Sequence, residues 1–512
     1  MNYTEIFPKI IAHCKEHGFI FPSSEIYDGL SAVYDYGQLG AALKRNLRES
    51  WWKEMTQLHE NIVGIDSAIL MHPLVWKASG HIDAFNDPLI DNKDSKKRYR
   101  ADQLIEDFLD KLLQKSIKET EKKAAKENWS PSDEAYQRFL KGNRDAQKHQ
   151  VLLAKYTEAM QQNNMEALKN LIDEAGITDP ETGSKNWTDI RQFNLMFKTQ
   201  LGSMAETAQD LYLRPETAQG IFVNFLNVQK SSRLKVPFGI AQVGKSFRNE
   251  IVARQFIFRM REFEQMEMQF FIKPGTQHTW FNYWLNARFQ WHISLGIEPQ
   301  KLRFKPHEKL AHYADAATDI EFMFPFGFKE LEGVHSRTDF DLSRHQEISG
   351  KKMAYFDPDD QTSFIPYVVE TSAGLDRTVL THLCNAYREE EVPTAEAGES
   401  ALRTVLSFHP EVAPVKIAVF PLVKKDGLPE IATQIASELR KNYSVTYEEK
   451  DTIGRRYRRQ DAKGTPFCIT IDNQTHEDQK VTVRHRDSML QERVATTQLE
   501  TFFKNNLSSR KG

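Results

Sequence analysis

The sequence predicts an α+β fold for most of the chain, interrupted by a helical insertion and followed by a smaller α/β domain. Three changes of pattern support this prediction. Short β-rich runs with glycine turns occupy about residues 22–80 and return at 211–272. Between them, about residues 92–190 are strongly charged and show helical spacing. From about residue 412, strand-like and helix-like runs alternate. We therefore expect one domain over 1–410, with the insertion inside it, and a second domain over 412–512.

The composition is that of an ordinary globular protein. The chain has 512 residues, of which 40% are hydrophobic and 27% are charged. These values exclude collagen-like, low-complexity and disulfide-framework classes, and the length suggests about three folding units. Lys and Arg number 68 against 71 Asp and Glu, so the net charge is only −3. A nucleic-acid partner would therefore have to bind local basic patches.

Cysteine usage and hydropathy indicate a reducing, aqueous setting. The three cysteines, Cys14, Cys384 and Cys468, are far apart and form no CxxC pair. This spacing disfavours a thiolate zinc site and a secreted disulfide scaffold. No window approaches a membrane span, and the N-terminus carries Glu5 and Lys9 where a signal peptide needs an apolar stretch. We expect a cytoplasmic protein with no membrane association.

The insertion begins with one long amphipathic helix. Its apolar residues recur at the spacing of one helical face: Leu104, Ile105, Phe108, Leu109, Leu112, Leu113 and Ile117. Lysines dominate the rest of the surface: Lys111, Lys115, Lys118, Lys122 and Lys123. These lysines either contact RNA or form a solvated face, and the solvated face is favoured because charge runs are usually exposed.

Two strands are predicted within residues 236–272. The run VPFGIAQVG is followed, after about ten residues, by REFEQMEMQFFI beginning at Arg261. Because side chains alternate along a strand, Gln265 and Glu267 share a face opposite to Met266 and Met268. Inward polar groups on a core sheet need partners, so this polar face favours a site.

The connection between these strands is rich in arginine. Arg248, Arg259 and Arg261 lie in it or at its edges. A long connection with this composition is typical of anion binding. A solvated edge loop is the alternative, and the connection by itself supports both about equally.

Three further segments carry candidate chemistry. A strand ending at Gly374 leads into a helix with Arg377 in its first turn, an arrangement that suits phosphate. LRPETAQG at 213–220 places Glu216 at a helix start, where helix capping is the alternative function. Glu330 and Glu332 are two carboxylates that either hold a magnesium ion or are simply exposed.

Taken together, these segments resemble the class II aminoacyl-tRNA synthetases. FRNE at 247–250 with FRMREFEQME at 258–267 is similar to their motif 2, and GLDR at 374–377 is similar to motif 3. Within this superfamily, LRPETAQG, ETSAGLDR at 370–377 and the strings at 21–40 and 454–472 resemble the dimeric glycyl-tRNA synthetases. The resemblance covers about residues 5–505. It implies an antiparallel β-sheet catalytic core flanked by helices, a helical insertion between motif 1 and motif 2, and a C-terminal α/β anticodon-binding domain.

The resemblance also implies an activity and its partners. Such enzymes attach glycine to tRNA(Gly) through a glycyl-adenylate, with release of AMP and pyrophosphate. The implied partners are glycine, ATP, tRNA(Gly) and a second copy of the chain, with motif 1 near residues 60–80 at the dimer interface. ATP and Mg²⁺ are the implied cofactors. Many relatives carry cysteines where this chain has none at 91–98, so we expect no structural zinc.

The resemblance assigns roles to individual residues. Arg248, Glu330 and Arg377 are the implied catalytic residues, and Glu330 is also the implied magnesium ligand. The implied nucleotide site comprises Arg248, Asn249, Glu250, Phe258, Arg259, Met260, Arg261, Glu262, Phe263, Glu330, Leu331, Gly374, Leu375, Asp376 and Arg377. The implied glycine site comprises Arg100, Glu216, Phe263, Glu264, Gln265, Met266, Glu267, Glu370, Thr371, Ser372, Ala373 and Gly374. The implied tRNA contacts are Arg455, Arg456, Tyr457, Arg458, Arg459 and Arg484.

Two alternatives follow from the same residues. Another class II synthetase, of the prolyl or threonyl type, is disfavoured by the acid-lined pocket that the resemblance implies. Three acids would repel one another without a cation, so a purely structural role for them is disfavoured too. A catalytically silent RNA-binding relative is disfavoured because Arg248, Glu330 and Arg377 are all present.

Overall fold

The computed structural model divides the chain into two compact units. It describes residues 3–202, 209–251, 255–308, 310–311, 313–393 and 400–507. The main unit comprises Met1–Ser79, Lys198–Arg248 and Arg254–Gly512. The insertion unit comprises Gly80–Phe197 and Asn249–Ala253. The insertion is thus somewhat wider than the predicted range of about 92–190.

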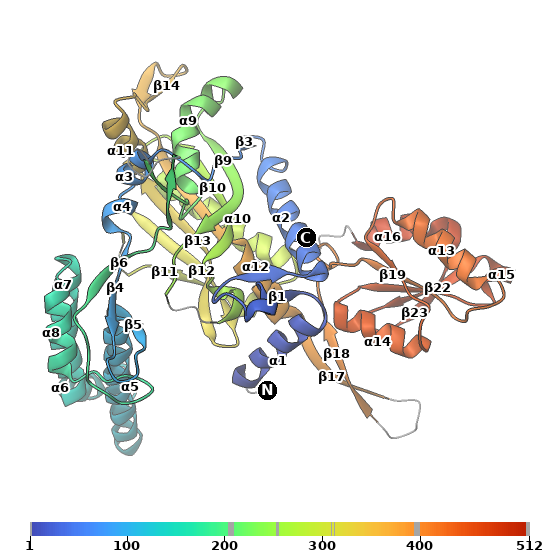
Figure 1. The fold of residues 1–512 in the computed structure, drawn as a ribbon, viewed down its shortest axis with the longest axis horizontal. Helices are drawn as coiled ribbons and strands as arrows, with labels where there is room; N and C mark the ends of the chain where they lie inside the picture. The colour runs from blue at the N-terminus through green and yellow to red at the C-terminus, as the bar shows by residue number, and fades with distance from the viewer. Residues whose placement is uncertain are drawn as a thin grey trace. The chain divides into compact units, whose positions relative to one another are not determined.

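A seven-stranded sheet forms the centre of the main unit (Figure 1). Its order is β11-β12-β13-β16-β10-β9-β3, and neighbours are antiparallel except for β3 and β9. The strands are β3 (Ile62–Gly64), β9 (Phe238–Phe247), β10 (Glu262–Ile272), β11 (Leu302–Pro306), β12 (Ala316–Phe324), β13 (Gly327–Thr338) and β16 (Tyr367–Gly374). The two strands predicted within 236–272 are β9 and β10.

Alternation along β10 divides the sheet into two different faces. Met266, Met268 and Phe270 enter the largest hydrophobic core, which also contains residues of α1 (Tyr3–Glu16) and of three further helices. These three are α2 (Gln38–Thr56), α10 (Gln277–Ser294) and α12 (Leu375–Ala386). On the other face, Phe271 packs with residues of α9 (Ala218–Ser232), and the alternate β10 positions before it are Phe263 and the polar residues Gln265, Glu267 and Gln269. Gln265, Glu267 and Gln269 are buried there, as the alternation predicts.

Smaller elements complete the first part of the main unit. They are α1 (Tyr3–Glu16), β1 (Ile20–Pro22), β2 (Tyr34–Tyr36), α3 (Pro73–Ala78), β7 (Lys198–Leu201), β8 (Gln209–Tyr212), α11 (Phe340–Ser349), β14 (Tyr355–Asp357), β15 (Thr362–Phe364), β17 (Tyr387–Pro393) and β18 (Ser400–Leu406). The strand pairs β1–β2, β7–β8, β14–β15 and β17–β18 are antiparallel.

The C-terminal segment of the main unit has its own sheet and core. The order is β20-β19-β21-β22-β23, with parallel pairing around β19 and antiparallel pairing beyond β21. The strands are β19 (Ile417–Pro421), β20 (Val445–Tyr447), β21 (Phe467–Ile471), β22 (Lys480–His485) and β23 (Gln491–Ala495). The helices are α13 (Leu428–Leu439), α14 (Ile453–Lys463), α15 (Thr475–Asp478) and α16 (Leu499–Leu507). The alternation predicted from residue 412 is therefore present.

The insertion unit is not entirely helical. Its long helix α5 (Ala101–Glu127) contacts α7 (Arg144–Gln161) and α8 (Met165–Ala175), and Ile105 and Leu109 lie in their shared core. Two short helices are α4 (His81–Ala84) and α6 (Glu134–Gly142). A three-stranded sheet joins β5 (Arg98–Arg100), β4 (Asn86–Asp91) and β6 (Arg191–Asn194). The sequence analysis missed this sheet because β4 and β6 lie about a hundred residues apart and are short and polar.

Every helix in the described part of the chain is too short or too polar to cross a lipid bilayer.

A buried ion pair fastens α10 to the central sheet. Arg288 Nε donates to Glu332 Oε1 at 2.6 Å, and His292 Nε2 lies 2.8 Å from Glu332 Oε2. All three side chains are buried. Burial alone would raise the pKa of Glu332, but Arg288 and His292 outweigh it and lower that pKa to about 2. Glu332 was a candidate magnesium ligand as a free carboxylate, whereas the structure commits it to this ion pair.

We predict that Glu332→Gln destabilises the main unit by about 3–5 kcal/mol at neutral pH, because it leaves a buried guanidinium without its counter-charge. Unfolding in urea measures this loss. Since the pKa of Glu332 is lowered in the folded state, its contribution is present above the ordinary value of 4.5 and is lost toward about 2. The difference between variant and wild type should therefore narrow as the pH falls below that ordinary value. Glu49→Gln, in an exposed pair with Arg45, is the control and should have little effect. A loss no larger than that of the control contradicts the role of Glu332.

Candidate active site

Three glutamates gather on the polar face of the central sheet. Glu267 lies on β10, Glu370 lies on the neighbouring strand β16, and Glu216 precedes α9. Glu267 is only 3% exposed and Glu370 only 4%. The charges of Glu370 and Glu216 both act on Glu267. The structure thus brings together three acids that are separated by 51 and 103 positions in the sequence (267 − 216 and 370 − 267).

Hydrogen-bond donors surround the carboxylate of Glu267. Ser372 Oγ donates to Oε1 at 2.8 Å and Gln265 Nε2 donates to the same oxygen at 3.0 Å. Thr217 Oγ1 donates to the other oxygen, Oε2. Gln265 is itself fixed by a hydrogen bond from Ser246 at 2.7 Å. These bonds hold the carboxylate in one orientation without providing a formal positive charge.

Glu370 has a stronger set of partners. Gln269 Nε2 donates at 2.7 Å, His335 Nδ1 lies 2.9 Å from Oε1, and Arg337 Nη1 lies 3.4 Å from both oxygens. Arg337 also forms a double hydrogen bond with Asp341 on α11, at 2.8 and 2.9 Å. Glu370 therefore shares the charge of Arg337 with a second acid.

The different partners move the two pKa values in opposite directions. Burial raises the pKa of Glu267, and the charges of Glu370 and Glu216 raise it further. Burial also opposes ionisation of Glu370, but Arg337 and His335 outweigh it and lower the pKa of that group. Glu267 thus keeps a proton at a pH at which an ordinary glutamate is ionised. A compact cation with several N–H donors could replace that proton.

Two arginines predicted to bind phosphate lie in the same unit. Arg248 Nε donates to the Pro215 carbonyl at 3.0 Å, and its guanidinium lies 5.3 Å from the Phe263 ring centroid. The Arg377 guanidinium lies 4.5 Å from the Phe258 ring centroid, and its Nη1 is 3.0 Å from Glu330 Oε2. Each cation thus lies beside an aromatic ring, which suits a ligand that is both anionic and aromatic.

Glu330 has the chemistry expected of a magnesium ligand. Its side chain is 50% exposed, and the charge of Arg377 lowers its pKa below the ordinary value. An ionised, accessible carboxylate oxygen is the kind of donor that Mg²⁺ prefers.

Arg214, which lies two residues before Glu216, has a structural function. It is 2% exposed and donates to the carbonyls of Lys245 at 2.6 Å and Ser67 at 2.8 Å. A Cβ at Gly244 would lie 2.2 Å from Arg214 Nη2, so that position leaves no room for a larger residue. Arg214 therefore fixes the segment that carries Glu216 to the edge of β9.

Several predicted site residues point into the core instead. Asp376 accepts hydrogen bonds from Lys44 Nζ and the Glu264 amide, both at 2.7 Å, and Lys44 also pairs with Glu264 at 2.7 Å. Other side chains buried among apolar groups are Met260, Met266, Leu331, Ala373 and Leu375. Thr371 is fully buried between them on β16. Ser372 and Gly374 share the polar face with Glu370 because they lie at alternate positions.

The remaining predicted residues lie at the ends of β9 and β10 or in the insertion unit. Arg261 donates to the Ser31 carbonyl at 3.1 Å, Glu262 pairs with Lys245 at 2.5 Å, and Arg259 is half-buried. Arg100 belongs to the insertion unit and pairs with Asp102 at 2.6 Å and Asp87 at 3.1 Å. Asn249 and Glu250 are grouped with that unit too, and the charge of Glu250 acts on Arg100.

The predicted tRNA contacts differ in accessibility. Arg456 is 2% exposed and donates to the carbonyls of Pro421 and Leu422, and Arg484 is 5% exposed and pairs with Asp461 at 2.8 Å. Arg459 pairs with two acids, Arg458 is half-buried and the Tyr457 hydroxyl bonds Thr470 at 2.6 Å. Arg455 is exposed.

Sequence reasoning missed three residues that hold the carboxylates. Thr217, His335 and Arg337 contact Glu267 or Glu370 directly. His335 and Arg337 occupy alternate positions of β13, so a polar alternation within 327–338 was an available signal. Without the pairing of β13 with β16, it does not indicate which residues they face.

Comparisons with known proteins identify the family of the chain and its parts. The family model for "Glycyl-tRNA synthetase insertion domain 1" matches residues 87–195, and the model for "tRNA synthetase class II core domain (G, H, P, S and T)" matches 197–386. The model for "Anticodon binding domain" matches 416–506. A glycine–tRNA ligase of Chlorobaculum tepidum is 51% identical over 98% of this chain and 99% of its own length. Those of Treponema denticola and Acetivibrio thermocellus are 47% and 48% identical, each over 98% of this chain and over 97% and 99% of their own lengths.

We predict that Glu267→Gln stabilises the main unit at about pH 9 but not at about pH 5. Because the pKa of Glu267 is raised in the folded state, wild-type stability falls as the pH rises above the ordinary value of 4.5. Glutamine mimics the protonated acid at every pH, so it avoids this loss, which we expect to exceed about 1.4 kcal/mol. Thermal unfolding at the two pH values measures it. Asp359→Asn, at an exposed carboxylate, controls for the loss of one acid. Equal changes in unfolding temperature at both pH values would refute the raised pKa.

Proposed function

Because this chain belongs to the glycine–tRNA ligase family of class II aminoacyl-tRNA synthetases, we propose that it joins glycine to tRNA(Gly) through a glycyl-adenylate. The family, the α+β fold class and the enzyme class predicted from the motifs are confirmed by this membership. The reaction consumes glycine, ATP and tRNA and releases AMP and pyrophosphate.

The glycine site is formed by Glu216, Glu267 and Glu370 with Ser372. The observation that supports it best is the burial of Glu267 and Glu370 on adjacent strands: Glu370 shares Arg337 with Asp341 and contacts His335, and the donors described around Glu267 are neutral. The ammonium group of glycine supplies the missing charge and three N–H donors. Its binding displaces the proton of Glu267. Larger amino acids are excluded by their bulk, which discriminates more strongly than a gain of one methylene contact.

The nucleotide site is formed by Arg248 and Arg377 with Phe258, Phe263 and the backbone around Leu331. The glycine carboxylate attacks the α-phosphorus of ATP, the bond to the bridging oxygen breaks, and pyrophosphate leaves. Arg248 neutralises the charge that develops on the α-phosphate, and Arg377 binds the terminal phosphate. Class II synthetases use ATP with Mg²⁺, and Glu330 is the residue that would hold the ion. When bound, Mg²⁺ neutralises phosphate charge and orients the polyphosphate.

The other predicted sites are also proposals. We propose that residues 1–410 form the catalytic domain, with the insertion at about 92–190, and that 412–512 bind the anticodon. The contacts of Arg100, Asn249 and Glu250 with substrate belong to the same proposal, as do those of the basic residues in α14. The side chains of Glu264 and Asp376 are bound to Lys44, so we propose that these two positions contribute through their backbone. Exposed Arg455 is the best supported of these, since phosphate contacts need accessible cations.

We further propose that the enzyme is a cytoplasmic homodimer. The predicted interface segment, residues 60–80, contains the exposed apolar side chains of Leu70 and Leu74. Exposed large apolar groups at a predicted interface support self-association. The cytoplasmic location follows from the role of the family in translation.

Glycine-dependent exchange of labelled pyrophosphate into ATP, without tRNA, tests the adenylate step. We expect exchange with glycine and none with alanine, serine or proline, since the site holds an ammonium group and excludes a side chain. Transfer of labelled glycine to tRNA(Gly) then tests the second step. Folded protein that supports no exchange with any of the four amino acids would overturn the proposed activity.

Two substitutions should separate the glycine site from the ATP site. Glu370→Gln removes a charge that contacts the ammonium group, so it should raise the glycine KM about 10- to 100-fold and change the ATP KM much less. Arg377→Gln should do the reverse. Both constants are measured by pyrophosphate exchange. Asp359→Asn is the control, and Ser372→Ala is a milder glycine-site variant if Glu370→Gln folds poorly. Equal effects of Glu370→Gln on both constants would count against its assignment.

A further inference from the structure

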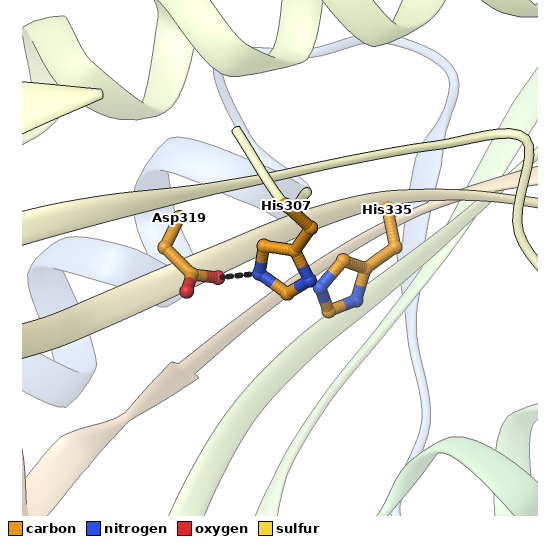
Figure 2. Close-up of side chains that lie close together, drawn as sticks. All are labelled: His307, Asp319 and His335. Atoms are coloured by element: carbon orange, nitrogen blue, oxygen red, sulfur yellow. Dashed lines mark ion pairs between the residues drawn. The ribbon is translucent and has the colours of Figure 1, made fainter. Parts of the chain in front are cut away.

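Two histidines and an aspartate form a cluster at one end of the central sheet. His307 directly follows β11, Asp319 lies on β12 and His335 lies on β13. Each offers one ligand atom, and these atoms lie within 4.8 Å of one another (Figure 2). His307 Nε2 is 2.9 Å from Asp319 Oδ1, and the two imidazole centroids are 5.6 Å apart. Side chains from three strands thus converge on one point.

Strand register explains this convergence. Asp319 pairs with Gly333, and Ala317 pairs with His335. The His307 amide donates to the Ala317 carbonyl at 3.0 Å, which continues the pairing of β11 with β12. Paired and alternate residues point to the same face, so the cluster lies on the polar face that also carries Glu370. The register therefore connects this cluster directly with the proposed glycine site.

Gly333 leaves space between the ligand atoms. A Cβ at this position would lie 3.2 Å from His335 Nε2 and 3.6 Å from Asp319 Oδ1. Both atoms thus face the point at which Gly333 lacks a side chain. Ligand distances of about 2.0–2.1 Å around zinc place tetrahedral donors about 3.3 Å apart. Small side-chain rotations would reach that spacing, and the His307 side chain is 34% exposed, so it is not enclosed on all sides.

The bonding of His335 fits a metal ligand. Its Nδ1 lies 2.9 Å from Glu370 Oε1, so Nδ1–H donates to that carboxylate and Nε2 is the ring nitrogen left to bind an ion. A histidine held in this way between a carboxylate and a metal ion is the common arrangement in zinc proteins. Two imidazoles and one carboxylate favour zinc-type ions over Mg²⁺, which prefers oxygen donors.

We propose that His307, Asp319 and His335 bind a divalent transition-metal ion of the zinc type, with water at the remaining position. The ion adds positive charge one hydrogen bond away from Glu370, so it weakens binding of the glycine ammonium group. This second effect rests on the proposed function, whereas metal binding itself does not. The site is distinct from the thiolate zinc site that the absence of cysteines at 91–98 argues against.

Metal binding is tested on the full chain after removal of metals with a chelator. Equilibrium dialysis should find one Zn²⁺ per chain, and Co²⁺ should give the visible absorption of a four-coordinate site. His307→Ala and Asp319→Asn should each weaken Zn²⁺ binding at least about 10-fold. His485→Gln is the matched control, since His485 pairs with Glu492 at 2.7 Å in a different sheet. Circular dichroism verifies that each variant is folded. Sub-stoichiometric Zn²⁺, or equal affinity in the wild type and both cluster variants, would overturn the site.

The coupling is tested by calorimetric titration of glycine without ATP. Zn²⁺ should weaken glycine binding several-fold in the wild type and leave it unchanged in His307→Ala. Unchanged glycine affinity in Zn²⁺-loaded wild type would refute the coupling. Absence of glycine binding in the metal-free protein would instead count against the proposed function, so the two failures are distinguishable.

Discussion

Burial of like charges on adjacent strands is the constraint on which this site depends. Glu267 and Glu370 lie on β10 and β16, away from water, where two ionised acids strongly disfavour each other. The fold accommodates them with neutral donors around Glu267, with Arg337 near Glu370, and with a proton kept on Glu267. The groups that make burial of this pair possible therefore come from segments that are distant in the sequence. The same pair retains a deficit of positive charge, which supports the proposed binding of an ammonium group there.

Buried acids on the two faces of the sheet differ in how far positive charge compensates them. On the face covered by α10, Glu332 is fully compensated by Arg288 and His292, so it contributes to stability. On the polar face, Glu370 shares Arg337 with Asp341, and Glu267 has no cation among its hydrogen-bond partners in the described structure. An acid whose charge is fully compensated contributes to stability. Acids whose charge is incompletely compensated can still attract a cationic ligand. Glu332 and His335 lie three residues apart on β13 and point to these two opposite faces, where His335 contacts Glu370.

The polar face also extends the site beyond its three glutamates. His335 contacts Glu370 through Nδ1 and faces His307 and Asp319 with its other nitrogen. The His335 imidazole thus takes part both in the glutamate group and in the cluster with His307 and Asp319. We therefore expect a change of charge in one group to alter the electrostatics of the other. The three cysteines take no part in this arrangement, since Cys14 and Cys468 are buried and Cys384 is half-buried among core residues. The metal site that we propose uses imidazole and carboxylate ligands on the sheet, whereas a search for zinc sites by cysteine spacing looks for thiolate ligands.

The sequence by itself determined the features that depend on local order. Alternation at Gln265 and Glu267 predicted a polar face, Arg377 after Gly374 predicted a helix start, and the motif strings predicted the family. Tertiary structure alone decided which side chains are available. It buried Arg456 and Arg484, committed Asp376 to Lys44, and placed His335 and Arg337 beside Glu370. The reason is physical: periodicity is a property of neighbours along the chain, whereas burial and ion pairing arise between strands and helices that meet only in the folded protein.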